Sequence, residues 1–337
     1  MKHVTIRALA QALNLSVSTI SKALRDSYEI SEETKQRVLE LAARLNYMPN
    51  PYASSLRGKQ SRNIGVVIPE VADSFFSLAI NGIESVVKEK GYHVLIYLTH
   101  EQFANEQSIL REFQGGRVDG VLLSVSRETV SGQHILDLMA RDIPVVFFDR
   151  TLADVEADKI VTDDFDSGYT ATQHLLDKGC RQIAYLTISE NLSISAQRME
   201  GYLKALSGHG LRPSRNDIVQ CSADSTFNYN QVKKMLQRKK RPDGILASVE
   251  KLANPVYQAC RELSLAIPEH VKVICFSNLE IATILHPPLT TITQPAFEIG
   301  KTAASVLLKA LDKKRARPSV QEVIIPSSLI IRESSGR

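Results

Sequence analysis

The sequence predicts an α/β protein made of a small all-α N-terminal domain followed by a two-lobed domain with parallel sheets. Within residues 1–49, three short amphipathic segments follow helical spacing. From residue 62 onward, short apolar runs alternate with amphipathic helical stretches, which is the βαβ rhythm of a parallel sheet. Several of these runs recur in similar form in the second half of the chain, which indicates two similar lobes.

Each helix expected in the N-terminal domain has a hydroxyl side chain at its start. Such a side chain accepts a hydrogen bond from an amide of the first helical turn and so caps the helix. Two short helices joined by a tight turn and braced by a third form a helix-turn-helix, whose second helix enters the major groove of DNA. The expected helices span 6–12, 17–24 and 31–45, and the capping side chains are Thr5, Ser16 and Ser31.

The excess positive charge of the chain lies at its N-terminus. Residues 1–60 contain nine Lys or Arg and five Asp or Glu, a net charge of +4. The whole chain, with 41 basic and 37 acidic residues, also carries +4, so the remaining residues are formally neutral. A basic head on a neutral body is expected of a nucleic-acid-binding protein, although ordinary surface solvation also produces such a distribution.

A stretch between the two domains has start and stop signals for a helix of about two turns. Asn50 suits an N-cap, Pro51 the first helical position and Gly58 a left-handed exit. Isolated helices shorter than about 12 to 15 residues are marginal in water, so this helix needs outside contacts to form. We therefore expect residues 50–61 to be a conditional hinge helix and linker.

The α/β domain is expected to span residues 62–337 and to bind a ligand between its two lobes. Ligands of open α/β sheets bind beyond the carboxyl ends of the strands, so two facing lobes form a cleft there. The predicted strands lie at 63–69, 94–98, 118–125, 144–149, 182–188, 242–248, 271–277, 323–326 and 329–332, and the predicted helices include 77–91 and 297–311.

Cysteine spacing and hydropathy disfavour other classes of protein. The cysteines form no CxxC pair, so we expect buried thiols and neither a zinc site nor a disulfide framework. No apolar run of about 18 residues and no signal-peptide core is present, so we expect a cytoplasmic protein without a membrane partner. The four cysteines are Cys180, Cys221, Cys260 and Cys275.

Motifs of enzymes are incomplete. Gly300-Lys301-Thr302 resembles the end of a phosphate-binding loop, but the first glycine of that motif would fall at Pro295. His100-Glu101 begins a metalloprotease motif whose second histidine is replaced by Ala104. No GxGxxG follows a strand, and no GxSxG is present. We therefore expect no enzyme, no cofactor and no metal site.

An ordered set of motifs runs through the N-terminal domain. They are Val4-Thr5-Ile6-x-x-Leu9-Ala10, Leu15-Ser16-x-Ser18-Thr19-Ile20-Ser21-Lys22-Ala23-Leu24, Ser31-x-x-Thr34-x-x-x-Val38 and Leu45-Asn46-Tyr47-x-Pro49-Asn50. This order of residues resembles the LacI/GalR family of bacterial transcription regulators. The resemblance extends over essentially the whole chain and implies a periplasmic-binding-protein-like effector domain. It implies a first lobe at about 62–161 and 290–320 and a second at about 162–289 and 321–337.

The resemblance implies two kinds of DNA contact in the head and a third in the hinge. Lysine pairs with guanine, a hydroxyl serves either base type and valine packs on a thymine methyl, so residue chemistry agrees with it. In the hinge, Leu56 matches a leucine that wedges between base pairs in the minor groove. The implied base-reading residues are Val17, Ser18 and Lys22, the phosphate contacts Thr5, Ser16, Thr19, Ser21, Ser31 and Thr34, and the minor-groove contacts Asn50, Ala53 and Leu56.

For the cleft, the resemblance implies a set of aromatic, acidic and basic effector contacts. Aromatic faces suit the apolar faces of sugars, and carboxylates and a guanidinium suit hydroxyls or an anion. The implied contacts are Asp73, Ser74, Phe75, Phe76, Ser124, Asp149 with Arg150, Asp163 with Phe165, Arg198, Ser277 and Gln294. Two positions depart from the family pattern, because Val249-Glu250 replaces Asn-Asp and Ser277 replaces an aspartate.

The expected function is a homodimeric repressor of transcription that binds a palindromic operator and responds to a small molecule, with a carbohydrate as the expected class. The two departures leave open a regulator controlled by a ligand other than a sugar or by a protein partner. An alternative from another class is a solute-binding protein of the same two-lobed architecture. That alternative requires export and does not account for the basic helix-turn-helix.

Overall fold

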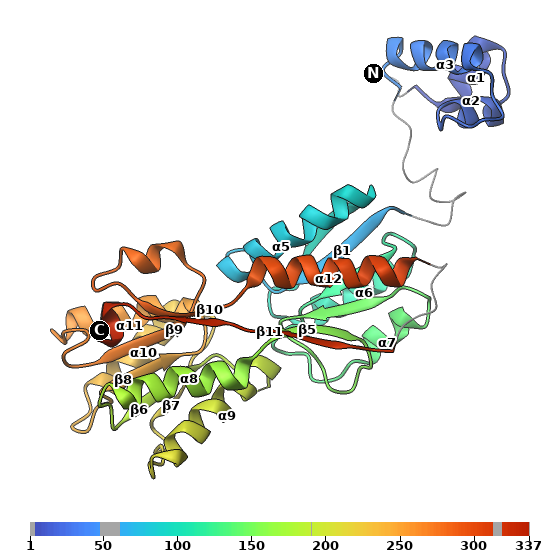
Figure 1. The fold of residues 1–337 in the computed structure, drawn as a ribbon. Helices are drawn as coiled ribbons and strands as arrows, with labels where there is room; N and C mark the ends of the chain where they lie inside the picture. The colour runs from blue at the N-terminus through green and yellow to red at the C-terminus, as the bar shows by residue number, and fades with distance from the viewer. Residues whose placement is uncertain (1–3, 48–60, 190, 313–318, 337) are drawn as a thin grey trace. The chain divides into compact units, whose positions relative to one another are not determined.

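The computed structural model describes residues 4–47, 61–189, 191–312 and 319–336, and the chain divides into two units, Met1–Ser61 and Arg62–Arg337 (Figure 1). The described part of the first unit is all α, with a single apolar core that includes Leu9, Ile20 and Val38. This confirms the predicted three-helix head. Its helices are α1 (Ile6–Leu13), α2 (Val17–Ala23) and α3 (Glu32–Arg44).

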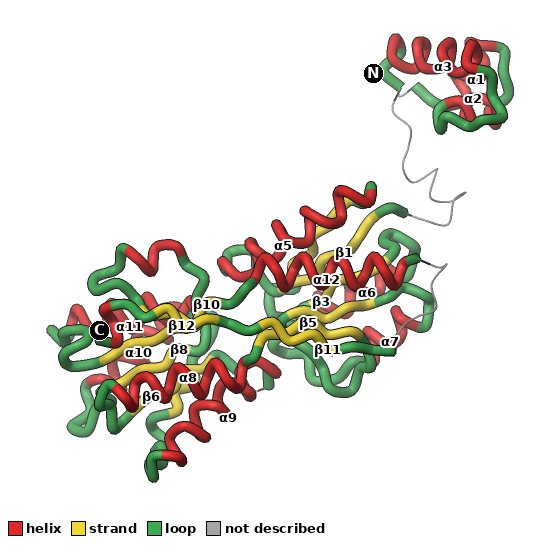
Figure 2. Tube along the Cα trace, in the orientation of Figure 1, coloured by secondary structure: helices red, strands yellow, loops and turns green. Residues whose placement is uncertain are grey.

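The second unit contains two six-stranded sheets that lie at opposite ends of the body (Figure 2). The first sheet has the order β11-β5-β4-β3-β1-β2, and all its pairings are parallel. Strands near-continuous in apolar residues, such as β4, are buried on both faces, as parallel sheets require. The strands are β1 (Asn63–Ile68), β2 (His93–Leu98), β3 (Gly120–Leu123), β4 (Val145–Phe148), β5 (Asp158–Thr162) and β11 (Glu322–Ile325).

The second sheet repeats this arrangement with the order β12-β10-β9-β8-β6-β7. Only one of its pairings, β10 with β12, is antiparallel. The repeat explains why the apolar runs of the two halves of the chain resemble each other. The strands are β6 (Ile183–Thr187), β7 (Ile218–Gln220), β8 (Gly244–Ala247), β9 (Lys272–Phe276), β10 (Thr290–Thr293) and β12 (Ser328–Ile330).

Helices cover both faces of each sheet and make two three-layer lobes. In the first lobe, α5 and α12 share an apolar core with one face of the sheet, while α6 and α7 pack on the other. In the second lobe, α8 and α9 cover one face, and α10 and α11 cover the other. These helices are α5 (Ser74–Val87), α6 (Phe103–Phe113), α7 (Gln133–Met139), α8 (Asp164–Asp177), α9 (Ser193–Gly208), α10 (Ser225–Leu236), α11 (Ala253–Glu262) and α12 (Ala296–Leu311). Four short 3₁₀ segments, η1 (Lys88–Lys90), η2 (Glu250–Leu252), η3 (Glu280–Thr283) and η4 (Glu333–Ser335), complete the described elements.

Two late strands correct the predicted lobe boundaries. Strand β10, expected in the first lobe as part of 290–320, pairs with β9 in the second sheet. Strand β11, expected in the second lobe as part of 321–337, pairs with β5 in the first sheet. The chain therefore returns to the first lobe only after β10, at α12, and leaves it again between β11 and β12.

Within the described residues, the chain passes between the lobes three times, at β5–α8, β10–α12 and β11–β12, and these crossings lie side by side (Figure 2). Asp163, at the first crossing, accepts a hydrogen bond from the amide of Ser327 at the third, at 2.7 Å. Gln294, at the second, donates to the Thr162 hydroxyl at 3.4 Å. The three crossings are thus tied into one hinge.

Glycines allow close contact between paired helices in each lobe. A Cβ on Gly201 of α9 would lie 2.1 Å from the carbonyl oxygen of Phe165 in α8. A Cβ on Gly82 of α5 would lie 2.0 Å from the carbonyl oxygen of Phe297 in α12. The helix backbones therefore meet directly, and α9 holds its side chains at a fixed distance from α8.

Replacing Gly201 by alanine is expected to destabilise the second lobe. Alanine favours a helix by up to about 1 kcal/mol, but the clash with a backbone carbonyl forces α8 and α9 apart and costs about 1 to 3 kcal/mol more than it gains. Gly208→Ala is the matched control, because it lies on the same helix and the added Cβ would meet no described atom within 4 Å. Urea unfolding should show a lower midpoint for Gly201→Ala alone. Equal midpoints for the two variants would contradict the close helix contact.

Candidate ligand cleft and nucleic-acid interface

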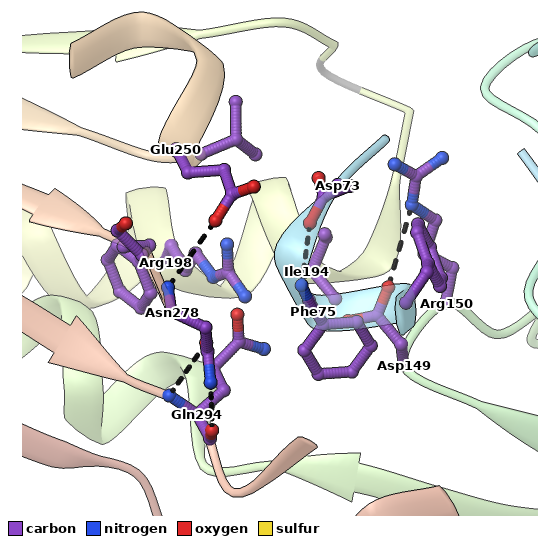
Figure 3. A pocket seen from close by; sticks show the side chains of 13 residues that line it. Asp73, Phe75, Asp149, Arg150, Ile194, Arg198, Glu250, Asn278 and Gln294 are labelled. Carbon is purple, nitrogen blue, oxygen red and sulfur yellow. Dashed lines mark hydrogen bonds and ion pairs between the residues drawn. The ribbon is translucent and has the colours of Figure 1, made fainter. Parts of the chain in front are cut away.

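A small cavity lies where the carboxyl ends of strands from both sheets face each other (Figure 3). Asp73 caps α5 after β1, Asp149 follows β4, and Ser277 follows β9. The space among these side chains is about 30 Å³, enough for about two water molecules. The lining residues are Asp73, Phe75, Phe76, Asp149, Arg150, Ile194, Arg198, Val249, Glu250, Phe276, Ser277, Asn278 and Gln294.

Arg198, from α9, is buried at the centre of the cleft. Its Nε donates to Asp164 Oδ1 at 2.6 Å, and Nη1 donates to the carbonyl of Ser248 at 2.5 Å. The guanidinium lies 4.0 Å from the ring centre of Phe276. Burial alone lowers the pKa of Arg198, but the Asp164 and Asp149 carboxylates raise it overall, so the group keeps its charge. Nη2 is buried and has no hydrogen-bond partner among the described residues.

Asp149 is one of the acidic residues that line the cleft. It is only 5% exposed, and it is backed by the Ser124 hydroxyl, which donates to Oδ2 at 3.5 Å. Burial raises the pKa of Asp149 to about 7, against the opposing effect of Arg150 and Arg198. Arg150 itself is held by Glu101, with Nη1 at 3.0 and 2.9 Å from the two carboxylate oxygens. Asp149 can therefore exchange a proton near neutral pH.

The first turn of α5 forms the other side of the cleft. Asp73 Oδ1 accepts from the Phe75 amide at 3.0 Å and so caps the helix. Burial and then the charge of Glu250 raise the pKa of Asp73 to about 6. The Ser74 amide donates to Glu250 Oε1 at 2.7 Å, and the Ser74 hydroxyl donates to Oε2. The two lobes therefore touch directly at this point.

The structure brings most of the cleft residues implied by the sequence into one place. Ser74 and Ser124 contact Glu250 and Asp149 instead of lining the cavity. Phe165, on α8, is 39% exposed and lies outside the lining, because α8 turns its backbone there toward α9. The implied residues that do line the cavity are Asp73, Phe75, Phe76, Asp149, Arg150, Arg198, Ser277 and Gln294.

Five lining residues were not among the implied contacts, and two of them, Val249 and Glu250, were noted only as a departure from the family pattern. Ile194 lies one helical turn before Arg198, so the helical spacing of α9 carried a signal for it. Asn278 follows Ser277 at a strand end, and its amide group donates to the Gln294 carbonyl at 2.6 Å. Phe276 ends the apolar strand β9, where a core position and a ligand platform look alike in the sequence.

In the N-terminal head, every predicted cap is present. Thr5 Oγ1 accepts from the Ala8 amide at 3.3 Å, and Ser31 Oγ accepts from the Thr34 amide at 3.4 Å. Ser16 Oγ accepts from the Thr19 amide at 3.0 Å and also lies 2.6 Å from the Ser18 hydroxyl. A group of hydroxyls therefore marks the start of α2, where phosphate oxygens are favoured by the helix dipole.

The implied base-reading residues have different surroundings. Val17 packs partly against the head core, and Ser18 is exposed. Lys22 forms an ion pair with Glu29, and the two side chains are 43% and 47% exposed. Ser21 accepts from Arg25 through its hydroxyl at 3.0 Å. An exposed ion pair of this kind contributes about 1 kcal/mol or less, so Lys22 can leave Glu29 at small cost.

Some predictions concern other parts of the chain. The hinge residues Asn50, Ala53 and Leu56 lie outside the described residues. The four cysteines are buried, as predicted. Among the described residues, no cluster of three or more His, Cys, Asp or Glu is arranged to hold a metal, and no helix is long and apolar enough to cross a membrane.

Comparison with known proteins identifies the family. Residues 5–50 match the bacterial regulatory proteins of the lacI family, and residues 172–335 match a periplasmic binding protein-like domain. The ribose operon repressor of Haemophilus influenzae is 28% identical over 330 residues, or 98% of each chain. The transcriptional repressor PurR of Vibrio cholerae is 30% identical over 314 residues, or 93% of each chain.

Solved structures share the fold. The lac repressor dimer bound to operator and the anti-inducer ONPF has a TM-score of 0.85 with 23% identity and covers 100% of both chains. A LacI family regulator from Enterococcus faecium with bound ribose has a TM-score of 0.71 with 25% identity, covering 81% of this chain and 98% of that one.

The fold and site thus define a DNA-binding transcription regulator with a small-molecule-binding domain, and not an enzyme. The chain belongs to the LacI family of bacterial regulatory proteins.

The raised pKa of Asp149 predicts stability that falls as the pH rises. The pKa of this carboxyl rises from its ordinary value of 3.8 to about 7 on folding, so the folded state binds more protons between these values. The free energy of unfolding should therefore drop by about 3 kcal/mol from pH 5 to pH 8. Asp73 acts in the same direction, because its pKa is also raised.

Asp149→Asn should remove much of this slope, because asparagine does not titrate. Urea unfolding at a series of pH values measures it, with the exposed residue Glu280 changed to glutamine as the control. A variant whose unfolding free energy keeps the wild-type slope would contradict the assignment to Asp149.

Proposed function

We propose that this regulator is a homodimeric repressor that binds a palindromic operator in the cytoplasm and is controlled by a hydroxyl-rich small molecule, a sugar or sugar derivative, bound between its lobes. The observation that carries the proposal is the Nη2 atom of Arg198, which has no partner among the described residues and is buried in a cleft on the same chain as a helix-turn-helix head. A solute-binding protein of the same architecture has no use for such a head.

The head supplies the DNA-binding half of this function. The hydroxyls of Ser16, Ser18 and Thr19 gather at the start of α2 and suit phosphate or base contacts, while Lys22 lies further along the same helix. Val17, which keeps part of its surface free, suits a thymine methyl. Phosphate contacts of the remaining implied residues, Thr5, Ser21, Ser31 and Thr34, belong to the same proposal.

The hinge helix expected within residues 50–61 couples DNA binding by the head to ligand binding by the lobes. We assign Leu56 the role of a minor-groove wedge, with Asn50 and Ala53 beside it, in a helix that forms when two copies meet DNA. An apolar wedge unstacks a base step at a cost of a few kcal/mol, which the bent duplex repays with further contacts. Ligand binding that changes the lobes biases this helix, and linkage requires that operator DNA change effector affinity by the same factor.

The cleft favours a ligand with hydroxyls. A hydroxyl accepts a hydrogen bond from Arg198 Nη2 and donates one to Asp73 or Asp149. Ribose is the ligand in the structure of the Enterococcus faecium regulator, and the Haemophilus influenzae relative is a ribose operon repressor. We therefore propose a sugar of this class as the first candidate effector.

Lys22→Ala is expected to weaken specific operator binding about 10- to 100-fold, because a good base contact contributes about 1 to 3 kcal/mol. The operator is first obtained by selection from random duplexes, and affinities are measured by fluorescence anisotropy at several salt concentrations. Lys204→Ala, an exposed lysine of the second lobe, is the control. Unchanged affinity of Lys22→Ala would remove this residue from the interface.

Wild-type affinity should itself fall by roughly 10³ to 10⁵ between 50 and 200 mM salt if about 6 to 10 phosphates are neutralised. A flat salt response would count against the DNA-binding head.

Arg198→Ala is expected to abolish the thermal shift that an effector gives the wild-type protein. Saturating ligand at about 100 times Kd stabilises by about 2.7 kcal/mol, which is several degrees in Tm for a domain of this size. The screen contains neutral sugars, sugar phosphates, nucleosides and purines. Arg261→Ala, an exposed arginine at the end of α11, controls for loss of charge. A compound that shifts Arg198→Ala as strongly as wild type would place the effector elsewhere.

A further inference from the structure

Glu250, at one of the two positions where the sequence departs from the family pattern, connects the two lobes. It begins η2 just after β8 of the second lobe, and its carboxylate reaches Ser74 at the start of α5 in the first lobe. Oε1 accepts from the Ser74 amide at 2.7 Å, and Oε2 accepts from the Ser74 hydroxyl. The main-chain amide of Asn278, which belongs to the same lobe as Glu250, donates to Oε2 at 3.4 Å.

The physical setting strengthens this contact. Glu250 is 9% exposed, and hydrogen bonds to a carboxylate gain strength where water is excluded. The carboxylate also lies at the N-terminus of the 14-residue helix α5, where the helix dipole favours a negative charge. Beside it, Lys251 lies 3.8 Å from Glu70 of the first lobe, so an ion pair also joins the two lobes there.

Glu250 also lines two cavities. One is the inner space of about 30 Å³, which Arg198 and Asp149 line as well. The other is a cavity of about 320 Å³, and Asp73 and Glu250 line both. The remaining lining of the larger cavity is largely apolar and comprises Glu70, Ala72, Lys251, Ala253, Asn254, Tyr257, Leu279, Ile281 and Leu285. The carboxylate therefore has room to move away from Ser74 without leaving the cleft.

We propose that Glu250 is an inter-lobe latch, which holds the two lobes together through Ser74, and that an effector enters by displacing its carboxylate from Ser74. The inner space is too small for a sugar while the latch is made, so binding and release of the latch are coupled. The displacing ligand supplies an acceptor oxygen to Ser74 and another to Arg198. This inference rests on the proposed function only in taking the cleft as the effector site.

The test measures lobe opening directly, without effector or DNA. Small-angle X-ray scattering of full-length wild type is compared with Glu250→Ala, which removes the latch, and with Glu250→Gln, which keeps its size and one acceptor oxygen. Glu280→Ala, an exposed residue of the same lobe, is the matched control. Hydrogen exchange of the peptide that contains Ser74 reports the loss of its amide hydrogen bond in the same samples.

Glu250→Ala should show a larger radius of gyration and about tenfold faster exchange at Ser74, and Glu250→Gln should give intermediate values. Glu280→Ala should superpose on wild type. A folded Glu250→Ala whose scattering superposes on wild type overturns the latch. If that variant does not fold, a wild-type scattering profile for Glu250→Gln overturns it equally. Loss of the proposed function would appear separately, as failure of wild type to bind a selected operator.

Discussion

The hinge formed by three adjacent chain crossings is the constraint on which the body depends. Asp163 ties the first crossing to the third through the amide of Ser327, and Gln294 ties the second to the first through Thr162. Because the crossings are tied side by side, the lobes are expected to move mainly by changing the angle between them. Contacts that cross the cleft, such as Glu250 with Ser74, then act on the closure of the whole cleft.

The sequence predicted the helices of the head and most strands of the body, but not β5 or β7, and it predicted the long-range pairing of strands less well. Helix caps such as Ser16 and the apolar strands of both lobes depend on residues that are close in the sequence, so they can be predicted from the local pattern. Strands β10 and β11 were assigned to the wrong lobes, because both are short and β-branched and fit either sheet. Their partners are chosen by tertiary contacts, and β11 pairs with β5 across more than half of the body sequence.

The cleft shows the same division between local and distant information. The ends of apolar strands can be predicted from the sequence, so Asp73, Asp149 and Ser277, which follow such strands, could be expected to line one cleft. Helix α9 contributes Ile194 and Arg198 to that space only because Gly201 lets it pack closely on α8. Phe165, on the other side of that helix contact, lies outside the lining for the same reason. Which face of a helix meets a cleft is set by this packing and not by its own pattern.

The charges of the cleft limit the ligand further. Arg198 is engaged by Asp164 and Arg150 by Glu101, so both cations are largely neutralised by partners outside the lining. Of the lining carboxylates, Asp149 lies 3.7 Å from Arg150, which Glu101 already pairs. Asp73 and Glu250 form no ion pair with the described residues.

A phosphate or carboxylate ligand would meet these groups as like charges in a medium of low dielectric, where repulsion is poorly screened. A neutral hydroxyl avoids this cost, because it donates to the carboxylates and accepts from Arg198 Nη2. The raised pKa values of Asp73 and Asp149 support the same conclusion. They show that the buried site disfavours negative charge, so an anionic ligand would be disfavoured there as well. Electrostatics therefore favours an uncharged, hydroxyl-rich effector over the phosphorylated form of the same compound.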